Sequence, residues 1–225
     1  MQQLFTKGIP GRHRKFKETK HGKTPNEWAP VRLKKCGKWG TGGTPDRDTP
    51  GFWNGNIPWV RSGEVDYRTI TDTEEKITEA GAMSINGDFL PCGTLLIAMY
   101  GAGKTRGKAA LLGVPAFINQ AIAFFKPSTG NNSKWFLYWF ERNYDRVRTS
   151  AKGSSQDNRS LYLLKNIAIY LPEEDEQDLI VEILESSDAM IDSLQSKTLA
   201  LLRLKKSLLQ NLLTGKVRVR TGGGA

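Results

Sequence analysis

Apolar residues recur with a heptad-like spacing through the last fifth of the chain and predict one long helix over residues 173–213. They are Ile180, Leu184, Ile191, Leu194, Leu201, Leu208 and Leu212. The acidic run 173–176 sits where the dipole of such a helix favours negative charge, Pro172 suits its first turn, and Gly215 suits its end. At 1.5 Å per residue the helix would be ~60 Å long. This length favours an antiparallel coiled coil over the alternative, a core helix folded back onto its own domain.

The pattern between residues 27 and 172 is mixed. Compact apolar runs at 95–99, 121–125 and 167–171 predict strands, and Gly- and Pro-rich turns separate the short apolar segments. Residues 133–149 repeat apolar positions at spacings of three and four, which predicts an amphipathic helix that Ser133 could cap. We therefore expect a single α+β domain of mixed strands and helices with irregular loops, followed by the long helix over 173–215.

Both ends of the chain are polar. Residues 1–26 are basic and rich in glycine and proline and predict a linker or surface arm, and residues 216–225 predict a tail. Gln3 to Gly8 resembles Asn211 to Lys216, which indicates one unit of a tandem repeat, although a match of six residues also arises by chance.

Charge and cysteine content narrow the class of protein. Lys and Arg number 33 against 23 Asp and Glu, a formal net charge of +10, which favours a polyanionic partner over a merely basic protein. The two cysteines, Cys36 and Cys92, are far apart, and both histidines lie in the N-terminal arm, so neither a disulfide framework nor a zinc site is expected. No signal peptide or membrane-length apolar run occurs, and we expect a cytoplasmic protein without membrane contact.

Two motifs suggest catalysis. Gly103-Lys104-Thr105 resembles the end of a phosphate-binding P-loop, but Ala98 stands where that loop needs a glycine, so we expect no nucleotide site. Asp46, Glu74 and Lys76 match the spelling of a metal-dependent nuclease. Solvated surface charges explain the three residues better, and the nuclease remains the alternative function. The chain contains no Asn-Pro-Pro-Tyr or Asp-Pro-Pro-Tyr methyltransferase motif.

An ordered series of motifs covers nearly the whole chain. It consists of WAPVRL at 28–33, TGGTP at 41–45, FWNGNIPWV at 52–60, LPCGTLL at 90–96, MYGAGKTRGK at 99–108, NQ at 119–120, GSSQDN at 153–158, IYLP at 169–172 and EQ at 176–177. Each motif alone is modest, but the ordered set is specific. The series resembles the target recognition domain and spacer helix of type I restriction-modification specificity subunits.

The resemblance implies a function without catalysis. Specificity subunits of this family hold two DNA-reading domains apart on antiparallel helices, and each domain reads half of a split double-stranded target. Separate methyltransferase subunits methylate adenine with S-adenosylmethionine, and separate restriction subunits use ATP and cut. We therefore expect a DNA-binding partner of these subunits that carries no cofactor. The chain departs from the family in having one domain and one helix, so it either pairs with a copy of itself or is a fragment.

Three groups of residues are candidates for DNA contact. Lysines, arginines and amides in glycine-rich loops suit phosphates and base edges, although each could instead cap a turn or carry a solvated charge. The candidates are Tyr100, Lys104, Thr105, Arg106 and Lys108 in one loop, Thr44, Arg61, Ser62 and Glu64 near another, and Gln156, Asn158 and Arg159 in a third.

Overall fold

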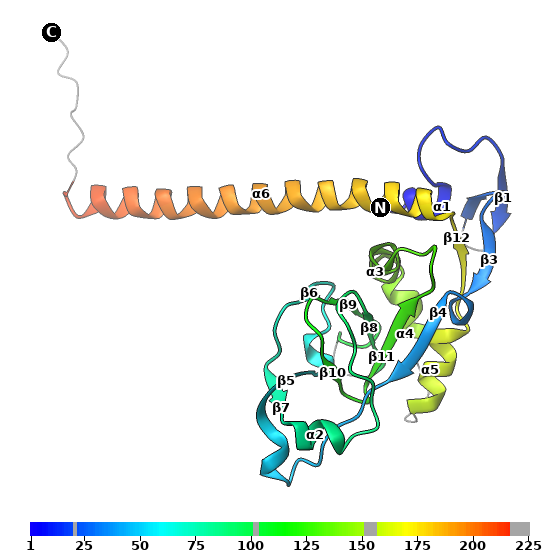
Figure 1. Cartoon of the computed structure of the whole chain (residues 1–225). Coiled ribbons are helices and arrows are strands. Elements are labelled where there is room, and N and C mark those ends of the chain that lie inside the picture. Colours follow the sequence, from blue (N-terminus) through cyan, green and yellow to red (C-terminus); the bar gives the residue numbers. More distant parts are fainter. Residues whose placement is uncertain (20–21, 101–103, 151–156, 217–225) are drawn as a thin grey trace. The chain divides into compact units, whose positions relative to one another are not determined.

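The computed structural model describes residues 1–19, 22–100, 104–150 and 157–216, with the backbone alone for residues 150 and 157–159. The chain divides into two compact units, Met1–Val181 and Glu182–Ala225. The first contains every strand and all helices but the last, and the last helix, α6, runs from the first unit into the second (Figure 1). The mixed α+β class expected from the sequence is confirmed.

A five-stranded sheet lies at the centre of the first unit. Its order is β4 (Gly37–Thr41), β11 (Ile122–Pro127), β8 (Leu95–Ala98), β9 (Ala109–Leu112) and β6 (Thr69–Ile70), antiparallel except for the parallel pair β6–β9. All residues of β8 and β9 are buried, which explains why their sequences are continuous apolar runs rather than alternating ones. The strands predicted at 95–99 and 121–125 are confirmed.

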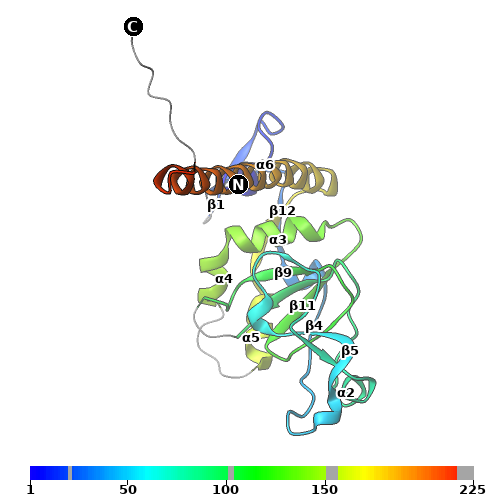
Figure 2. The same ribbon diagram turned by 90° about the vertical axis from the view of Figure 1, so that its left-hand side faces the viewer.

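Two helices replace the one predicted over residues 133–149. Helix α3 (Ser133–Arg142) ends at Asn143 and α4 (Tyr144–Ser150) follows. The side chain and the backbone amide of Asn143 both donate to the Trp139 carbonyl, at 2.9 and 3.0 Å, and the Asn143 backbone, with a φ of −102° and a ψ of 21°, leaves the helical conformation. Asn132, not Ser133, caps α3, because its Oδ1 accepts from the backbone N of Lys134 at 2.8 Å. Helix α3 packs across β8 and β9 (Figure 2).

A smaller sheet lies beside the first. Strand β5 (Trp53–Val60) pairs with β10 (Phe117–Ile118) in parallel and with β7 (Glu75–Ile77) antiparallel. The register of β5 against β7 shifts between Trp53 and Ile57, and Asn54 within this irregularity has a φ of 61°. The remaining short elements are α2 (Glu79–Met83) and the 3₁₀ turns η1 (Leu33–Lys35), η2 (Pro50–Phe52) and η3 (Ser62–Glu64). Helix α5 (Asp157–Lys165), which the sequence pattern did not predict, precedes β12.

The stretch expected to be an N-terminal arm contains regular structure. Helix α1 (Leu4–Lys7) is followed by a hairpin of β1 (Phe16–Thr19) and β2 (Gly22–Pro25), and β3 (Ala29–Arg32) pairs with β12 (Ala168–Leu171). Leu4 is buried, and the Phe5 ring lies 5.4 Å from the Trp135 ring. The turn residues that suggested a linker connect these short elements instead. The strand predicted at 167–171 is confirmed as β12.

The first turn of α6 (Glu174–Leu213) is anchored within the first unit by a buried carboxylate. Glu176 is 2% exposed, and its Oε2 accepts a hydrogen bond from Trp28 Nε1 at 2.9 Å. Its Oε1 accepts from the backbone N of Ile9 at 3.2 Å and lies 2.8 Å from His13 Nε2. From the sequence, the helix dipole was the only reason for this acidic run. Glu176 also makes polar contacts with Trp28, Ile9 and His13, which belong to other segments.

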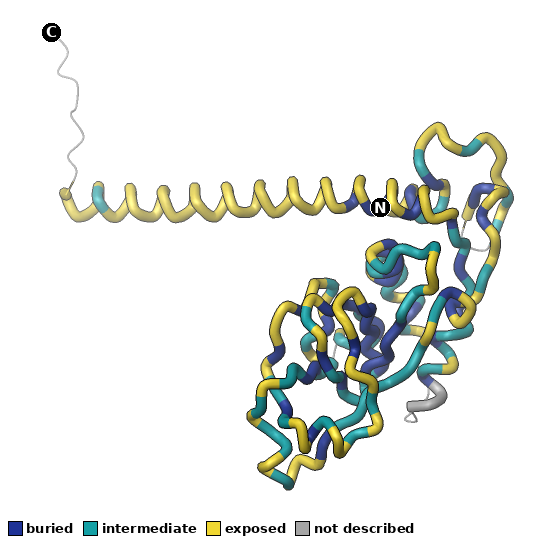
Figure 3. The backbone as a smooth tube through the Cα atoms, in the orientation of Figure 1, coloured by how far each residue is buried: buried dark blue, intermediate teal, exposed yellow. Residues whose placement is uncertain are grey.

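The long helix predicted over 173–213 is confirmed as α6, and Gly215, with a φ of +70°, follows its end. Ile180 and Leu184 are buried. The later apolar positions of the seam are 44–65% exposed (Figure 3): Ile191, Leu194, Leu201, Leu208 and Leu212. The partner in a coiled coil therefore remains a prediction. None of the helices in the described ranges is both long and apolar enough to cross a membrane.

Candidate nucleic-acid interface

The basic loop between β8 and β9 is the first candidate. Its described part, residues 104–108, is closed by a hydrogen bond from Gly107 N to Ala98 O at 2.8 Å and one from Ala98 N to Lys108 O at 3.0 Å. Ala98 is buried in β8, so the position where a P-loop needs an open glycine turn is inside a strand. Gly103 lies outside the described residues. The absence of a nucleotide site therefore stays a prediction.

Helix α4 supports this loop. Tyr144 Oη donates to the Lys104 carbonyl at 2.6 Å, and Arg148 Nη1 donates to Tyr144 Oη at 2.5 Å. Gly107 has a φ of +89°, and a Cβ there would lie 3.2 Å from the backbone of Arg148. Only glycine combines this backbone conformation with so close a neighbour. Neither Arg148 nor Tyr144 was among the candidates for DNA contact predicted from the sequence.

The cations of the loop differ in how they are paired. Lys108 forms an ion pair with Asp66. The exposed Lys104 has no ion-pair partner among the described residues. Thr105 and Arg106 are half-buried. Lys104 is therefore the cation of this loop most available to an external anion.

Three buried polar atoms around this loop have no hydrogen-bond partner within the described part of the chain. They are Tyr67 Oη, Tyr100 Oη and Arg106 Nε. Each such atom costs about 1–3 kcal/mol of stability. Burial also raises the pKa of Tyr67, whose backbone has a φ of 53°. The loop and its surroundings thus hold unsatisfied polar groups that a partner or water could satisfy.

The second candidate group is an ion-pair network around Arg61. The guanidinium pairs with the Glu74 carboxylate and, through Nη1, with Glu75 Oε1 at 3.1 Å. Glu64 accepts from the backbone N of Arg61 at 2.7 Å and from that of Glu74 at 3.0 Å, and desolvation by burial raises the pKa of Glu64. Ser62 opens the 3₁₀ turn η3 that holds Glu64 in place. Arg61 is therefore fixed by carboxylates of its own chain.

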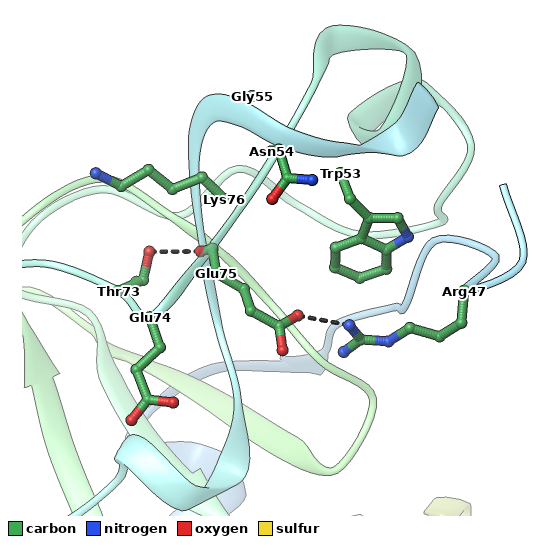
Figure 4. A pocket seen from close by; sticks show the side chains of 8 residues that line it. All are labelled: Arg47, Trp53, Asn54, Gly55, Thr73, Glu74, Glu75 and Lys76. Atoms are coloured by element: carbon green, nitrogen blue, oxygen red, sulfur yellow. Dashed lines mark hydrogen bonds and ion pairs between the residues drawn. The ribbon is translucent and has the colours of Figure 1, made fainter. Parts of the chain in front are cut away.

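A pocket of about 490 Å³ adjoins this network (Figure 4). The Arg47 guanidinium lies 3.9 Å from the centre of the Trp53 ring and pairs with Glu75 Oε2 at 2.6 Å. Asn54, which follows Trp53 in the irregular part of β5, also lines the pocket. These residues were not among the sequence candidates, although Trp53 and Asn54 lie within the FWNGNIPWV motif.

Residues 61–68 connect the two groups. Glu64 bonds to the backbone of Glu74 at one end, and Asp66 pairs with Lys108 at the other. A groove of about 430 Å³ is lined by Glu64 of this segment and by residues 68–74. The structure thus brings the loop at 104–108 and the Arg61 network onto adjoining parts of one unit.

The other candidates are less closely associated with these groups. Thr44 donates a hydrogen bond from Oγ1 to Gln120 Oε1. Gln156 lies outside the described residues. Asn158 and Arg159 lie in α5, where the positions of their side chains are not described.

The three residues of the nuclease alternative are engaged elsewhere. Asp46 accepts from Asp48 N at 3.1 Å and Thr49 Oγ1 at 2.9 Å, which closes a turn. Glu74 pairs with Arg61, and Lys76 Nζ lies 3.1 Å from Asp72 Oδ1. Within the described ranges, no group of three His, Cys, Asp or Glu side chains could hold a metal ion. Nothing in the structure or in the relatives supports a nuclease.

Comparison with known proteins places these features in a family. The model of the type I restriction modification DNA specificity domain matches residues 25–203. The MjaIX specificity subunit of Methanocaldococcus jannaschii is 26% identical, with 87% of this chain and 46% of that protein covered. The EcoR124I/EcoR124II specificity subunit of Escherichia coli is 30% identical over 72% of this chain and 41% of its own length. The chain thus spans about half the length of these relatives.

A solved structure agrees with this assignment. The HsdS subunit from Thermoanaerobacter tengcongensis superposes with a TM-score of 0.61 at 20% identity, covering 87% of this chain and 47% of that one. This likeness shows a shared fold, and the family match extends over most of the chain, from β3 through much of α6. The chain therefore belongs to the family of type I restriction-modification DNA specificity domains.

Proposed function

We propose that this chain reads one half of a split target in double-stranded DNA and directs adenine methylation, and restriction, by partner subunits. The observation that carries the proposal is the family match over residues 25–203, which includes both the candidate interface and most of the long helix. The proteins that share this match are named as specificity subunits of type I restriction enzymes. The formal charge of +10 suits a polyanionic partner.

We assign DNA contact to the two adjoining groups of the first unit. Lys104 is the principal phosphate contact of the loop, because its ammonium has no internal ion pair among the described residues. Thr105, Arg106, Lys108 and Tyr100 belong to the same surface. Arg61, Ser62, Glu64 and Thr44 form the neighbouring surface, where Arg61 must exchange a carboxylate for DNA. Gln156, Asn158 and Arg159 remain predicted contacts.

The chain itself supplies recognition and not catalysis. Methyltransferase subunits, and through them a restriction subunit, are the partners that we propose, and they provide the cofactors. Since the DNA of a bacterial or archaeal cell lies in the cytoplasm, we propose that the chain acts there. The long helix is where we expect these subunits and a second copy of the chain to bind.

The exposed seam of α6 supports self-pairing. Its leucines, from Leu194 to Leu212, are about half exposed in the single chain, which is an unusual surface for an unpaired helix. An antiparallel pair of these helices related by a two-fold axis would cover the same face on both copies. Such a pair would present two identical recognition domains, and the preferred target would be a split inverted repeat.

A selection from random duplex DNA tests the function directly. The purified chain, with a methyltransferase subunit of a type I system, should enrich one motif with a spacer of fixed length and methylate adenine within it. The chain alone with magnesium should leave the DNA uncut. Enrichment of no motif would refute sequence reading, and cleavage by the chain alone would favour the nuclease alternative.

A further inference from the structure

The first unit contains a second polar pocket, separate from the candidate interface. It measures about 220 Å³ and lies among α1, β2, the junction of α3 and α4, and β12. These elements come from both ends of the unit's sequence, and Figure 1 shows α1, α3, α4 and β12 in this region. The lining residues are Phe5, Thr6, Thr24, Trp139, Arg142, Asn143, Arg146, Ile169 and Tyr170.

Two arginines supply the charge of this pocket, and its lining includes no aspartate or glutamate. Arg142 and Arg146 are four residues apart at the junction of α3 and α4. Arg146 Nη2 donates to the Ala168 carbonyl at 2.5 Å, and its guanidinium lies 5.7 Å from the Trp139 ring centre. These contacts fix the Arg146 side chain in a half-buried position, where desolvation lowers its pKa.

Arg142 is different, because its guanidinium has neither a hydrogen bond nor an ion pair among the described residues. It is half-buried and lies on the pocket wall. A partly desolvated guanidinium with five donors and no acceptor is an incomplete arrangement. An anion in the pocket would complete it.

Hydroxyl groups line the pocket beside the arginines. Thr6 Oγ1 donates to the Gln2 carbonyl at 2.9 Å, and Thr24 is 2% exposed. The Tyr170 ring is also part of the lining, and the Lys17 ammonium lies 5.4 Å from its centre. The Thr6 and Thr24 hydroxyls and the Lys17 ammonium donate to backbone carbonyls, whereas the Tyr170 hydroxyl has no hydrogen-bond partner among the described residues.

We propose that this pocket binds a phosphate group. Guanidinium groups match the oxygens of phosphate with paired, charge-assisted hydrogen bonds, and the Tyr170 hydroxyl can donate to a remaining oxygen. The lining of the pocket contains no aspartate or glutamate that would repel an anion. The phosphate group comes from the DNA backbone or from a free phosphate compound. The pocket is independent of the proposed function, since its argument uses none of the DNA-contact candidates.

The first experiment uses inorganic phosphate alone. Titration of the full chain by calorimetry, with phosphate against chloride at equal ionic strength, should show saturable binding. Phosphate should also raise the Tm, since a ligand of the folded state stabilises it. Arg142→Gln should weaken phosphate binding by roughly tenfold or more, the effect of removing a charge-assisted contact. Arg14→Gln is the matched control, because Arg14 is exposed and outside the pocket.

A second variant and a second ligand complete the test. Tyr170→Phe removes one hydroxyl from the lining and should weaken phosphate binding less, which keeps the proposal testable if Arg142→Gln unfolds. A short DNA duplex is then added to the phosphate-bound protein. Displacement of phosphate assigns the pocket to the DNA backbone, and retention assigns it to a free phosphate compound. Phosphate that does not bind, or binds equally to wild type, Arg142→Gln and Tyr170→Phe, overturns the proposal. Duplex affinity measured on the same samples tests the proposed function separately.

Discussion

The cationic side chains at the candidate interface differ in whether they form ion pairs within the chain. Lys108 is paired with Asp66, and Arg61 with two glutamates, whereas Lys104 has no described ion-pair partner. A phosphate that approaches Arg61 must compete with these carboxylates. This competition reduces the contribution of Arg61 to DNA affinity. A phosphate at Lys104 faces no such competition. The sequence predicted Lys104, Lys108 and Arg61 equally as DNA contacts, because a sequence does not show which charges are neutralised within the fold.

Replacing Lys104 by alanine should therefore weaken duplex binding and reduce the slope of log affinity against log salt by about 0.9, the value for one phosphate contact. The measurement is a salt titration of duplex binding by fluorescence anisotropy. Lys35→Ala removes an equally exposed charge in η1 and is the control. If Lys104→Ala leaves both affinity and slope unchanged, the loop does not contact phosphate.

The two cysteines should differ strongly in reactivity. Cys36 is buried, and burial raises its pKa to about 11 from the ordinary 9.0, so the reactive thiolate is disfavoured. Cys92 is exposed. A maleimide at neutral pH should label Cys92 first and Cys36 only on unfolding, as peptide mass spectrometry would reveal. Equal labelling of the two in the folded chain would contradict the burial of Cys36.

The raised pKa of Cys36 also determines how the stability of the fold changes with pH. Above pH 9.0 the unfolded chain loses the Cys36 proton while the folded chain retains it up to about pH 11. The contribution of this buried thiol to stability is complete below pH 9.0 and declines across this interval. Cys36→Ala should therefore make the denaturant midpoint less sensitive to pH between 9 and 11 than that of the wild type.

At the scale of elements, apolar periodicity predicted the central strands and the long helix. It did not predict where a helix breaks or which elements contact one another. The strands at 95–99 and 121–125 and the long helix follow from apolar patterns that burial imposes. The break at Asn143 and the hairpin β1–β2 depend on local hydrogen bonds that apolar periodicity does not register. The hydrogen bond from Tyr144 to the basic loop joins segments that are distant in sequence. The basic loop at 104–108 could therefore be located from the sequence. The hydrogen bond by which Tyr144 of α4 holds this loop could not.

The start of α6 gives an element-scale prediction. Glu176→Ala should lower the free energy of unfolding by about 3 kcal/mol or more, because it leaves the Trp28 indole and the Ile9 amide without their acceptor in a buried site. Urea denaturation followed by tryptophan fluorescence measures this change. Glu174→Ala removes the same charge from the same turn at an exposed position and should cost less than about 1 kcal/mol. Equal losses would mean that only the helix dipole matters.

At the scale of the whole molecule, the two units have different sources of stability. The first unit contains a hydrophobic core formed by buried strand residues and by aromatic side chains of its helices. The second is a helix whose apolar residues are largely exposed, together with a groove of about 450 Å³ lined by Ile191, Leu194 and Leu199. An isolated helix gains little from propensity alone, so its stability depends on packing an apolar face. We therefore expect the second unit to pack against a partner helix, and we propose that a second copy supplies it.

Self-association is the corresponding prediction. A leucine that becomes fully buried contributes roughly 1.5–3 kcal/mol, so a few per helix can offset the cost of association. Light scattering at micromolar concentration should give a dimer of the 25.1 kDa chain. Leu194→Asp combined with Leu201→Asp should give a monomer, because each places a charge in the seam. Ser196→Asp adds the same charge on the opposite side of the helix from Leu194 and should leave the dimer intact. A wild-type chain that stays monomeric at these concentrations would rule out self-pairing and leave the seam to the helix of a different subunit.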